Sequence, residues 1–416
     1  MSICFSRAEA AASRMAETLR PRLLVLASTY PRWSGDSEPA FVHELARRLS
    51  GRFEVTVITP HARGAKRREI LDGVSVLRYR YAPTAMETLV HGGGIVTHLR
   101  RAPWKWLLVP GFVLMQVFAA RRAIARWRPV LIHAHWLLPQ GLVARLLASH
   151  GVPYVLTSHG ADLFALRGRW FARCRRWVMA RAAATSVVSQ AMRCQLEAES
   201  PHARVAVMPM GVDARQRFTP DAAVPRVVGE LLFVGRLVEK KGLHHLVEAM
   251  PAILAEHPEV RLTIVGFGPA ESSLRNRIDR LGLGGAVQFL GAMASEALPA
   301  LYRRATLFVA PFVQARSGDQ EGLGLVVAEA MACGCPVVAG DVPGVRDLAA
   351  DGCAALVEPA NPGALAATVI TLLADAPGRA RLAAVARARV LERFDWQAVA
   401  ARYADFLAAA SELPRR

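Results

Sequence analysis

Two carboxylates stand out in an otherwise apolar stretch, EGLGLVVAEAMACGCPVVA, residues 321–339. If this stretch were helical throughout, Glu321 and Glu329 would lie about two turns apart along the axis. Gly322 and Gly324 suit a loop that approaches another group closely, and LVVAEAM suits the start of a helix. Because helix N-termini bind phosphate, the pattern predicts a diphosphate between the two acids. The alternative is that Glu321 favours the helix dipole and Glu329 is a solvated surface acid.

A second stretch with charged residues at a strand end is LLFVGRLVEKKGLHHLVEA, residues 231–249. An apolar strand is expected to end at Gly235 and Arg236, and Lys241 follows at the opening of a helix. Arginine supplies a planar fork of donors and lysine a mobile point charge, which together suit a diphosphate. Taken alone, the stretch also fits two solvated side chains near a strand end.

Together these stretches resemble the retaining glycosyltransferases of family 4, which have the GT-B fold. The motifs that carry the resemblance are GRLVEKKG, VGFGP, VQFLG and EGLGLVVAE followed by AMACGCPVVA, in the order and spacing of the family. The resemblance begins at LLVLASTYPRWSGDSEPAFVHELARRL and extends over nearly the whole chain. It implies an α/β protein of two doubly wound, Rossmann-like parallel-sheet domains facing a central cleft, with a C-terminal closing helix.

The resemblance also implies roles for the charged residues. Arg236 and Lys241 would neutralise the donor diphosphate and stabilise the departing nucleoside diphosphate. Glu321 would contact the donor sugar, and Glu329 would bind the ribose hydroxyls. The other donor contacts implied by the motifs are Gly235, Gly266, Val287, Phe289, Gly322, Leu323, Gly324 and Leu325, of which Val287 and Phe289 lie where the base is held.

The N-terminal half matches the family less completely. His159 in TSHGADL corresponds to the histidine that faces the donor sugar across the cleft, in a positioning or charge-stabilising role. The alternative is a structural histidine at the end of a strand. The loop SGDSEP contains only Gly35 where the family often has two glycines, and Gly35 is the expected phosphate contact. VPGVRD stands where many relatives have Gly-Gly and then Glu.

Two further histidines form the pattern H-x-H, which invites a metal interpretation. On a strand His133 and His135 would point to the same face, but no carboxylate partners complete a metal site. We therefore expect no metal and no cofactor other than the nucleotide-sugar substrate, with His135 as a candidate for the acceptor cleft. The six cysteines include no C-x-x-C motif, which fits a reduced cytosolic setting.

Apolar runs alternate with helical segments along the chain, as in parallel sheets. They occur at 23–29, 53–60, 130–136, 153–160 and 186–190, and a second set begins after the Pro- and Gly-containing segment MPMGVDARQRFTPDAAVPR. The sequence predicts an N-terminal, acceptor-binding domain at 21–207, a linker at 208–229 and a nucleotide-sugar-binding domain at 230–395. Residues 1–20 are predicted to be a leader, and one interpretation of this leader is that it is disordered. Residues 396–416 are predicted to form a helix that packs back toward the N-terminal domain.

The net charge of +18 lies entirely in the N-terminal half. Residues 1–210 contain 30 Lys and Arg against 12 Asp and Glu, whereas residues 211–416 contain 22 of each kind. Such a half suits an anionic membrane surface or a phosphorylated substrate, and the absence of RNA- and DNA-binding signatures argues against nucleic acid. Arg and Trp are interleaved in HLRRAPWKWLL, AARRAIARWRP and ALRGRWFARCRRWVMAR, as in interfacial segments. Alternatively, the arginine stems cover buried helices.

The most hydrophobic run is WLLVPGFVLMQVFAA, residues 106–120. A helix that spans a membrane needs about 20 apolar residues, and this run is shorter and contains Pro110 and Gln116. We therefore expect a buried or interfacial helix.

The predicted function is transfer of a hexose, with retention, from a nucleotide diphosphate sugar to a hydroxyl of a lipid-linked or polysaccharide acceptor, in bacterial envelope or exopolysaccharide synthesis. The basic N-terminal domain favours a lipid-linked or anionic saccharide acceptor, and the expected location is the cytoplasm, peripherally on the inner face of the plasma membrane. The alternatives are a nucleotide-sugar epimerase of the same fold and a non-catalytic sugar-nucleotide binding module.

Overall fold

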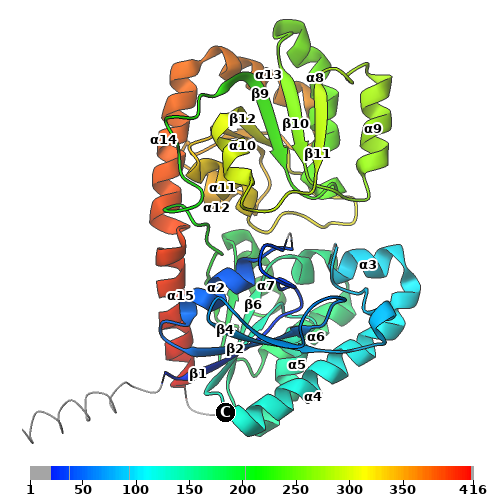
Figure 1. The fold of residues 1–416 in the computed structure, drawn as a ribbon, viewed down its shortest axis with the longest axis vertical. Helices are drawn as coiled ribbons and strands as arrows, with labels where there is room; N and C mark the ends of the chain where they lie inside the picture. The colour runs from blue at the N-terminus through cyan, green and yellow to red at the C-terminus, as the bar shows by residue number, and fades with distance from the viewer. Residues whose placement is uncertain (1–19, 37, 93, 202, 414–416) are drawn as a thin grey trace, which may run out of the picture.

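Two α/β domains, one above the other in Figure 1, make up the protein. The computed structural model describes residues 20–36, 38–92, 94–201 and 203–413. The predicted leader therefore lies outside the described residues except for Arg20. Each domain is built on its own sheet, so the predicted α/β class with two Rossmann-like domains is confirmed.

The sheet of the N-terminal domain has the strand order β3-β4-β2-β1-β5-β6-β7-β8 and is parallel except between β3 and β4. Every residue of β5 and β6 is buried, because helices cover both faces of the sheet. Its strands are β1 (Arg22–Leu26), β2 (Glu54–Pro60), β3 (Arg68–Leu71), β4 (Val74–Tyr79), β5 (Leu131–His135), β6 (Tyr154–Ser158), β7 (Ala184–Val187) and β8 (Val205–Val207).

The antiparallel hairpin of β3 and β4 was not predicted. β3 is short and half exposed, with the sequence REIL, so it lacks the continuous apolar run of a buried parallel strand. Its turn contains Asp72 and Gly73, a common pair in two-residue hairpin turns, and this pair was the available signal.

Helices cover both faces of this sheet. α2 and the C-terminal helix α15 contact each other on one face, while α4, α5 and α6 form a contiguous layer. The helices are α2 (Phe41–Leu49), η1 (Thr84–Met86), α3 (Ile95–Arg101), η2 (Pro103–Leu108), α4 (Val109–Trp127), α5 (Gln140–Leu146), η3 (Ala148–His150), the π-helical η4 (Ala161–Ala165), α6 (Arg169–Met179) and α7 (Gln190–Glu199).

The apolar run predicted at 106–120 is part of a longer helical segment. η2 and α4 follow each other without a break over 103–127, and by length and composition this is the one helix among the described residues that could cross a membrane. However, Phe112, Gln116 and Ala120 are buried, and α4 packs against β2 and β4. The segment is therefore an element of the N-terminal domain that keeps one apolar side exposed.

The C-terminal domain has a wholly parallel sheet of order β11-β10-β9-β12-β13-β14. Its strands are β9 (Val227–Val234), β10 (Arg261–Val265), β11 (Val287–Gly291), β12 (Ala305–Ala310), β13 (Val337–Gly340) and β14 (Ala355–Val357). Its helices are η5 (Glu239–Lys241), α8 (Leu243–Glu256), α9 (Glu271–Arg280), α10 (Leu298–Arg304), α11 (Leu325–Ala332), α12 (Arg346–Ala349), α13 (Pro362–Ala374) and α14 (Ala376–Arg393).

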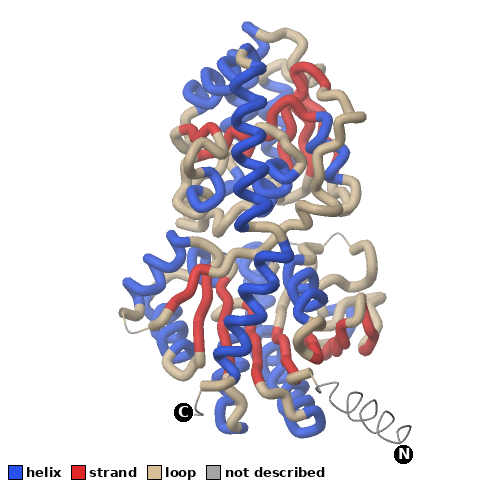
Figure 2. The backbone as a smooth tube through the Cα atoms, turned by 90° about the vertical axis from the view of Figure 1, so that its left-hand side faces the viewer, coloured by secondary structure: helices blue, strands red, loops and turns tan. Residues whose placement is uncertain are grey.

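The chain crosses between the domains twice, in the segment after β8 and between α14 and α15. α15 (Trp396–Ser411) continues the line of α14 down one side of the molecule and contacts α2, β5 and β6 of the N-terminal domain (Figure 2). The two crossings are joined by backbone pairing of Val212 with Asp395. β9 begins at Val227, inside the segment predicted as linker.

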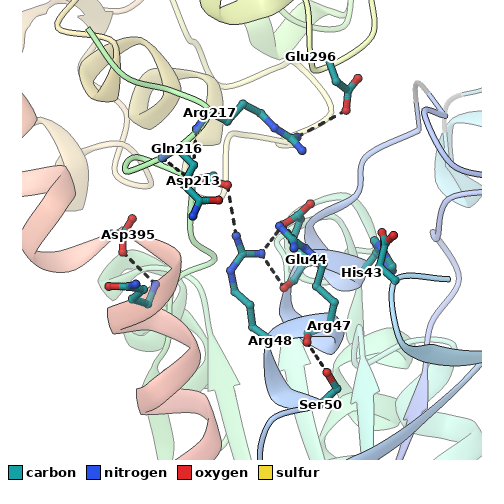
Figure 3. Close-up of polar contacts among 12 residues, drawn as sticks. His43, Glu44, Arg47, Arg48, Ser50, Asp213, Gln216, Arg217, Glu296 and Asp395 are labelled. Carbon is teal, nitrogen blue, oxygen red and sulfur yellow. Dashed lines mark hydrogen bonds and ion pairs between the residues drawn. The ribbon is translucent and has the colours of Figure 1, made fainter.

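Ion pairs hold this crossing region to both domains (Figure 3). Asp213 lies 3.6 Å from Arg48 of α2, and Arg217 lies 3.7 Å from Glu296 of the C-terminal domain. Arg215 pairs with Asp395 at 3.1 Å. The linker is therefore tied to α2 below and to the loop before α10 above.

Candidate active site

The ends of β9 and β10 form the floor of the candidate donor site. Gly235 and Gly266 follow these two strands, and a Cβ atom on Gly266 would lie 1.9 Å from the carbonyl oxygen of Gly235. Only glycine fits at Gly266, because a side chain would overlap the neighbouring backbone. This close approach fixes the loop that presents Arg236.

Lys241 and Glu321, which the sequence places 80 positions apart, form a direct ion pair. Lys241 Nζ lies 2.8 Å from Glu321 Oε2, and both side chains are largely buried. Burial alone would raise the pKa of Glu321, but Lys241 and the neighbouring Lys240 lower that pKa to about 2. Glu321 is therefore ionised throughout the physiological pH range. Lys240 itself pairs with Asp319 at 3.2 Å, a pair that the motifs did not predict.

The loop after Glu321 is one of the places where the two domains touch. A Cβ atom on Gly322 would lie 2.8 Å from the carbonyl oxygen of His159, so the backbones of the two domains are in contact there. On its other side, Gly344 of the VPGVRD segment approaches still more closely, because a Cβ atom on Gly344 would lie 2.1 Å from the carbonyl oxygen of Glu321. The structure thus brings the donor loop that follows Glu321 against the backbone of His159, while contact of either side chain with the donor sugar stays a prediction. It also places the divergent VPGVRD segment directly behind the donor loop.

Glu329 lies in α11, the helix that begins at Leu325 directly after this loop. Gly324 caps the helix without a side-chain hydrogen bond, so the first-turn N–H groups have no side-chain cap at this end. Glu329 accepts a hydrogen bond of 3.0 Å from the hydroxyl of Tyr302. Burial raises the pKa of Glu329 to about 7, and the bond from Tyr302 offsets only part of that rise. The two acids of the motif therefore have opposite pKa shifts.

Arg236 reaches across the cleft. Its Nη2 donates to the hydroxyl of Thr97 on α3 of the N-terminal domain at 3.0 Å. Burial lowers the pKa of Arg236, although arginine remains charged at any physiological pH. Thr97 was not predicted, because α3 contains no motif residue and reaches the cleft only through the fold.

Three histidines form a stacked column at the ends of β5 and β6. His135 Nδ1 and His159 Nε2 are 2.9 Å apart, and the rings of His133 and His135 lie 4.2 Å apart. His133 and His135 thus share a face of the sheet, as predicted. His135 is fully buried beneath His159, however, so its prediction as a residue that lines the acceptor cleft was wrong. The neighbouring strands and Trp136 cover it.

Burial lowers the pKa of all three imidazoles, that of His159 to about 3. They are therefore neutral, and a single N–H group forms the hydrogen bond between His135 Nδ1 and His159 Nε2. His133 Nε2 bonds the hydroxyl of Thr157 at 2.8 Å. This arrangement fixes the ring of His159 and makes His135 its support from below.

The remaining residues predicted to contact the donor lie around the charged pair rather than in it. The side chains of Val287 and Phe289 pack into the core beside α9, where Arg275 lies 4.1 Å from the centre of the Phe289 ring. Contact with a base through their backbone stays a prediction. Leu323 is buried within the donor loop, and Leu325 is half-buried at the start of α11. Gly35 lies in an open turn, where a Cβ atom would meet no other atom within 4 Å, and its contact with a phosphate stays a prediction.

Comparison with known proteins agrees with this geometry. The family model described as Glycosyl transferases group 1 matches residues 225–389, and that described as Glycosyltransferase Family 4 matches residues 40–216. A glycogen synthase of Mycobacterium tuberculosis is 30% identical over 326 residues, which are 75% of this chain and 77% of that protein. A GDP-mannose-dependent alpha-(1-6)-phosphatidylinositol monomannoside mannosyltransferase of Mycolicibacterium smegmatis is 34% identical over 223 residues, covering 51% of this chain and 58% of its own length.

Solved structures share the fold. Sucrose-phosphate synthase from Thermosynechococcus elongatus superposes with a TM-score of 0.77 at 24% identity, covering 94% of this chain and 100% of that one. Anabaena HepE in complex with UDP-glucose superposes with a TM-score of 0.69 at 21% identity, with the same coverage of both chains. The matched family models cover both domains, and the glycogen synthase relative aligns over three quarters of the chain. The chain is therefore a member of the group 1 glycosyltransferases of family 4, built on the GT-B fold.

Proposed function

We propose that this glycosyltransferase moves a hexose, with retention, from a nucleotide diphosphate sugar to a hydroxyl of a lipid-linked or polysaccharide acceptor in bacterial envelope synthesis. The observation that carries the proposal is the pair Lys241–Glu321 beside Arg236, next to the domain contact between Gly322 and His159. This arrangement supplies two cations for a diphosphate and one ionised carboxylate for sugar hydroxyls. The UDP-glucose bound by HepE and the GDP-mannose dependence of the mycobacterial relative support a donor of this class.

In the proposed reaction the acceptor oxygen attacks the anomeric carbon from the face that the diphosphate leaves. The bond from that carbon to the β-phosphate oxygen breaks with its electron pair, and the acceptor proton passes to this oxygen. Lys241 and Arg236 stabilise the negative charge that develops there. Attack and departure on one face give retention, and no protein nucleophile takes part.

Glu321 and Glu329 have separate tasks in this proposal. Once Lys241 turns to the diphosphate, the carboxylate of Glu321 is free to accept hydrogen bonds from the sugar. Glu329 accepts bonds from the ribose hydroxyls beyond the start of α11. His159, neutral and supported by His135, positions the sugar from the opposite domain.

A peripheral location on the inner face of the membrane forms part of the proposal. Along η2 and α4, Leu107, Leu114 and Phe118 are 82%, 63% and 61% exposed. Arg121 and Arg122 follow them on the same helix and are exposed. Apolar side chains next to cations favour insertion at an anionic lipid surface. We call these five residues the α4 face.

Product analysis tests the proposed reaction. Nucleoside diphosphates and their sugars are first screened by thermal shift, since a ligand that binds the folded state raises the melting temperature. The selected donor is then incubated with the protein, with and without a lipid extract, and the anomeric configuration of the product is read by NMR. Transfer with retention is expected. A new nucleotide sugar formed without acceptor would indicate the epimerase, and binding without turnover would indicate the binding module.

A further inference from the structure

A hollow of about 690 Å³ opens beside the donor site, on the N-terminal side of the cleft. Its walls come from α3, η2, α4, the loop after β5, and the segment from η4 to α6. Most of the side chains that line it are apolar or aromatic, among them Leu99, Trp106, Val113, Leu142, Trp170 and Phe171. The hollow is large enough for a ligand of appreciable size, and its walls suit a hydrocarbon rather than a free saccharide.

The hollow is continuous with the donor site. Arg236 and Lys240 contribute to its lining, and Lys240 is followed directly by the Lys241 that pairs with Glu321. A ligand in the hollow would therefore have one end within reach of the sugar carried by the diphosphate.

The rim of the hollow carries aromatic and basic side chains. Trp106 and Trp170 line it and are also 49% and 68% exposed, which places them at its opening. Arg100 and Arg101 line it as well, and both are exposed. Arg100 donates hydrogen bonds to the carbonyl of Ala165 and to the hydroxyl of Ser317, and both of these partners are uncharged. Two arginines without a carboxylate partner among the described residues complement a phosphate or diphosphate.

We propose that the hollow binds the hydrocarbon chain of a lipid acceptor whose phosphate groups lie against Arg100 and Arg101. This inference rests on the proposed function and narrows its acceptor from lipid or polysaccharide to a lipid phosphate. The part of a long chain that exceeds the hollow runs out past Trp106 along the α4 face. The saccharide or hydroxyl head of the lipid points to the donor sugar beside Arg236.

Binding of a short lipid phosphate to the full chain tests the proposal. Farnesyl phosphate, kept below its micelle concentration and without vesicles, is titrated against the intrinsic tryptophan fluorescence, since Trp106, Trp136 and Trp170 line the hollow. Farnesol and inorganic phosphate are titrated in parallel. Saturable binding of farnesyl phosphate, weaker binding of farnesol and none of inorganic phosphate are expected. Equal binding of farnesyl phosphate and inorganic phosphate would overturn the proposal, because the apolar walls would then contribute nothing.

Variants assign the binding to this hollow. Leu142→Trp fills it, and Trp170→Ala removes an exposed part of its rim without touching the core, so both should raise the Kd for farnesyl phosphate, by about tenfold or more for Leu142→Trp. Arg101→Ala should weaken the binding of farnesyl phosphate but leave the binding of farnesol unchanged. Ile70→Glu, at an exposed position of β3 outside both the hollow and the α4 face, is the matched control and should bind as the parent does. Unchanged binding in both Leu142→Trp and Trp170→Ala would overturn the proposal.

The donor site supplies an independent readout. The thermal shift by the nucleoside diphosphate should persist in Leu142→Trp, which shows that the variant is folded and the donor site intact. If the parent chain shows this shift but does not bind farnesyl phosphate, the hollow is wrongly assigned while the donor site stands. If the parent chain shows no nucleotide shift, the proposed function itself fails.

Discussion

The donor side and the acceptor side of the cleft are built in different ways. On the donor side, glycines lie directly against neighbouring backbone, as at Gly266 on Gly235 and at Gly322 on His159. On the acceptor side, large side chains such as Trp106 and Trp170 surround a hollow. The donor side is proposed to recognise the diphosphate, a group common to many nucleotide sugars. The distances between its loop backbones are therefore tightly constrained. The acceptor side shapes an apolar volume, which many combinations of large residues can form.

The electrostatic contrast follows the same division. The donor side pairs its charges internally, Lys241 with Glu321 and Lys240 with Asp319. Arg100 and Arg101, at the rim of the hollow, form no ion pair within the described part of the chain. Paired charges have to exchange partners when the donor arrives, whereas the arginines of the rim are ready for an anion. Changes on the donor side should therefore weaken nucleotide binding and catalysis, and changes on the acceptor side should weaken binding of the acceptor.

Replacement of the ionised acid of the donor loop should have the largest effect. Glu321→Gln keeps the shape of the side chain but removes its charge. The donor sugar then loses the carboxylate that accepts its hydrogen bonds, and Lys241 loses its ion-pair partner. We expect kcat to fall by about 100-fold or more, by analogy with the loss of one electrostatic contact in other active sites. Asp405→Asn removes an exposed carboxylate of α15 that pairs with Arg52 and should leave kcat unchanged. Equal kcat in Glu321→Gln and the parent would refute the catalytic assignment of this acid.

Separation of the two domains at their contact should have the next largest effect. Gly322→Ala places a methyl group 2.8 Å from the carbonyl oxygen of His159, so the domains must move apart or the loop must shift. A loss of about 10- to 100-fold in kcat/KM is expected, since displacement of the reacting groups by about 1 Å has effects of that order. Gly284→Ala, where a Cβ meets no atom within 4 Å, is the control. A parent-like rate for Gly322→Ala would mean that catalysis does not need this contact.

The raised pKa of Glu329 predicts a pH dependence of donor binding. A carboxyl with a folded pKa of about 7 is protonated at pH 6 and ionised at pH 8, and the ionised form accepts ribose hydroxyl bonds better. The Kd for the nucleotide should therefore fall as pH rises from 6 to 8, by up to about tenfold per unit below the pKa. Glu329→Gln should remove this dependence. A dependence that persists in Glu329→Gln would point to another group.

Linkage gives the sign of the effect of Glu329 on stability. Its pKa is higher in the folded than in the unfolded protein, so the folded state binds more protons between the two values. The contribution of Glu329 to the free energy of unfolding is therefore complete below about pH 4 and is lost as pH rises to about 7. Tyr302→Phe removes the hydrogen bond that stabilises the ionised form, so it should raise this pKa further. Urea unfolding of both proteins at several pH values measures the difference.

Neutralisation of the α4 face should have the smallest effect. Arg121→Ala and Arg122→Ala should each weaken flotation with anionic vesicles about fivefold, because each cation near an anionic surface contributes about 1 kcal/mol. Nucleotide binding should not change. The control is Arg280→Ala, which removes an exposed arginine of the C-terminal domain. Flotation that is insensitive both to salt and to the two substitutions would contradict a membrane role for this face.

The donor side could be predicted from sequence because each of its motifs lies in one short stretch of the chain. GRLVEKKG and EGLGLVVAE each lie at a strand end or helix start, and the parallel order of β9, β12 and β13 brings such ends together. The pair Lys241–Glu321 follows from that geometry once the fold is known. The opposite pKa shifts of Glu321 and Glu329 could not be predicted, since they depend on Lys240 and on the burial of both acids.

The acceptor side was predicted less well for a physical reason. Its residues come from elements without a motif, and Thr97 reaches Arg236 only because α3 folds over the cleft. Alternation along β5 placed His135 on the correct face but could not show that His159 covers it. Likewise, the apolar composition of 106–120 indicated a helix, while its true length and exposed side became visible only in the structure.

Nucleotide binding by the charged pair tests the central claim most directly. Calorimetric titration of the full chain with the nucleoside diphosphate selected by thermal shift gives Kd for the parent, Lys241→Ala and Arg236→Ala. Arg280→Ala, which removes an exposed arginine of α9 outside the site, is the control. Loss of one charge-assisted contact should raise Kd by about 10- to 100-fold in each site variant and leave the control unchanged. Unchanged Kd in both site variants would contradict the assignment of the diphosphate to Lys241 and Arg236.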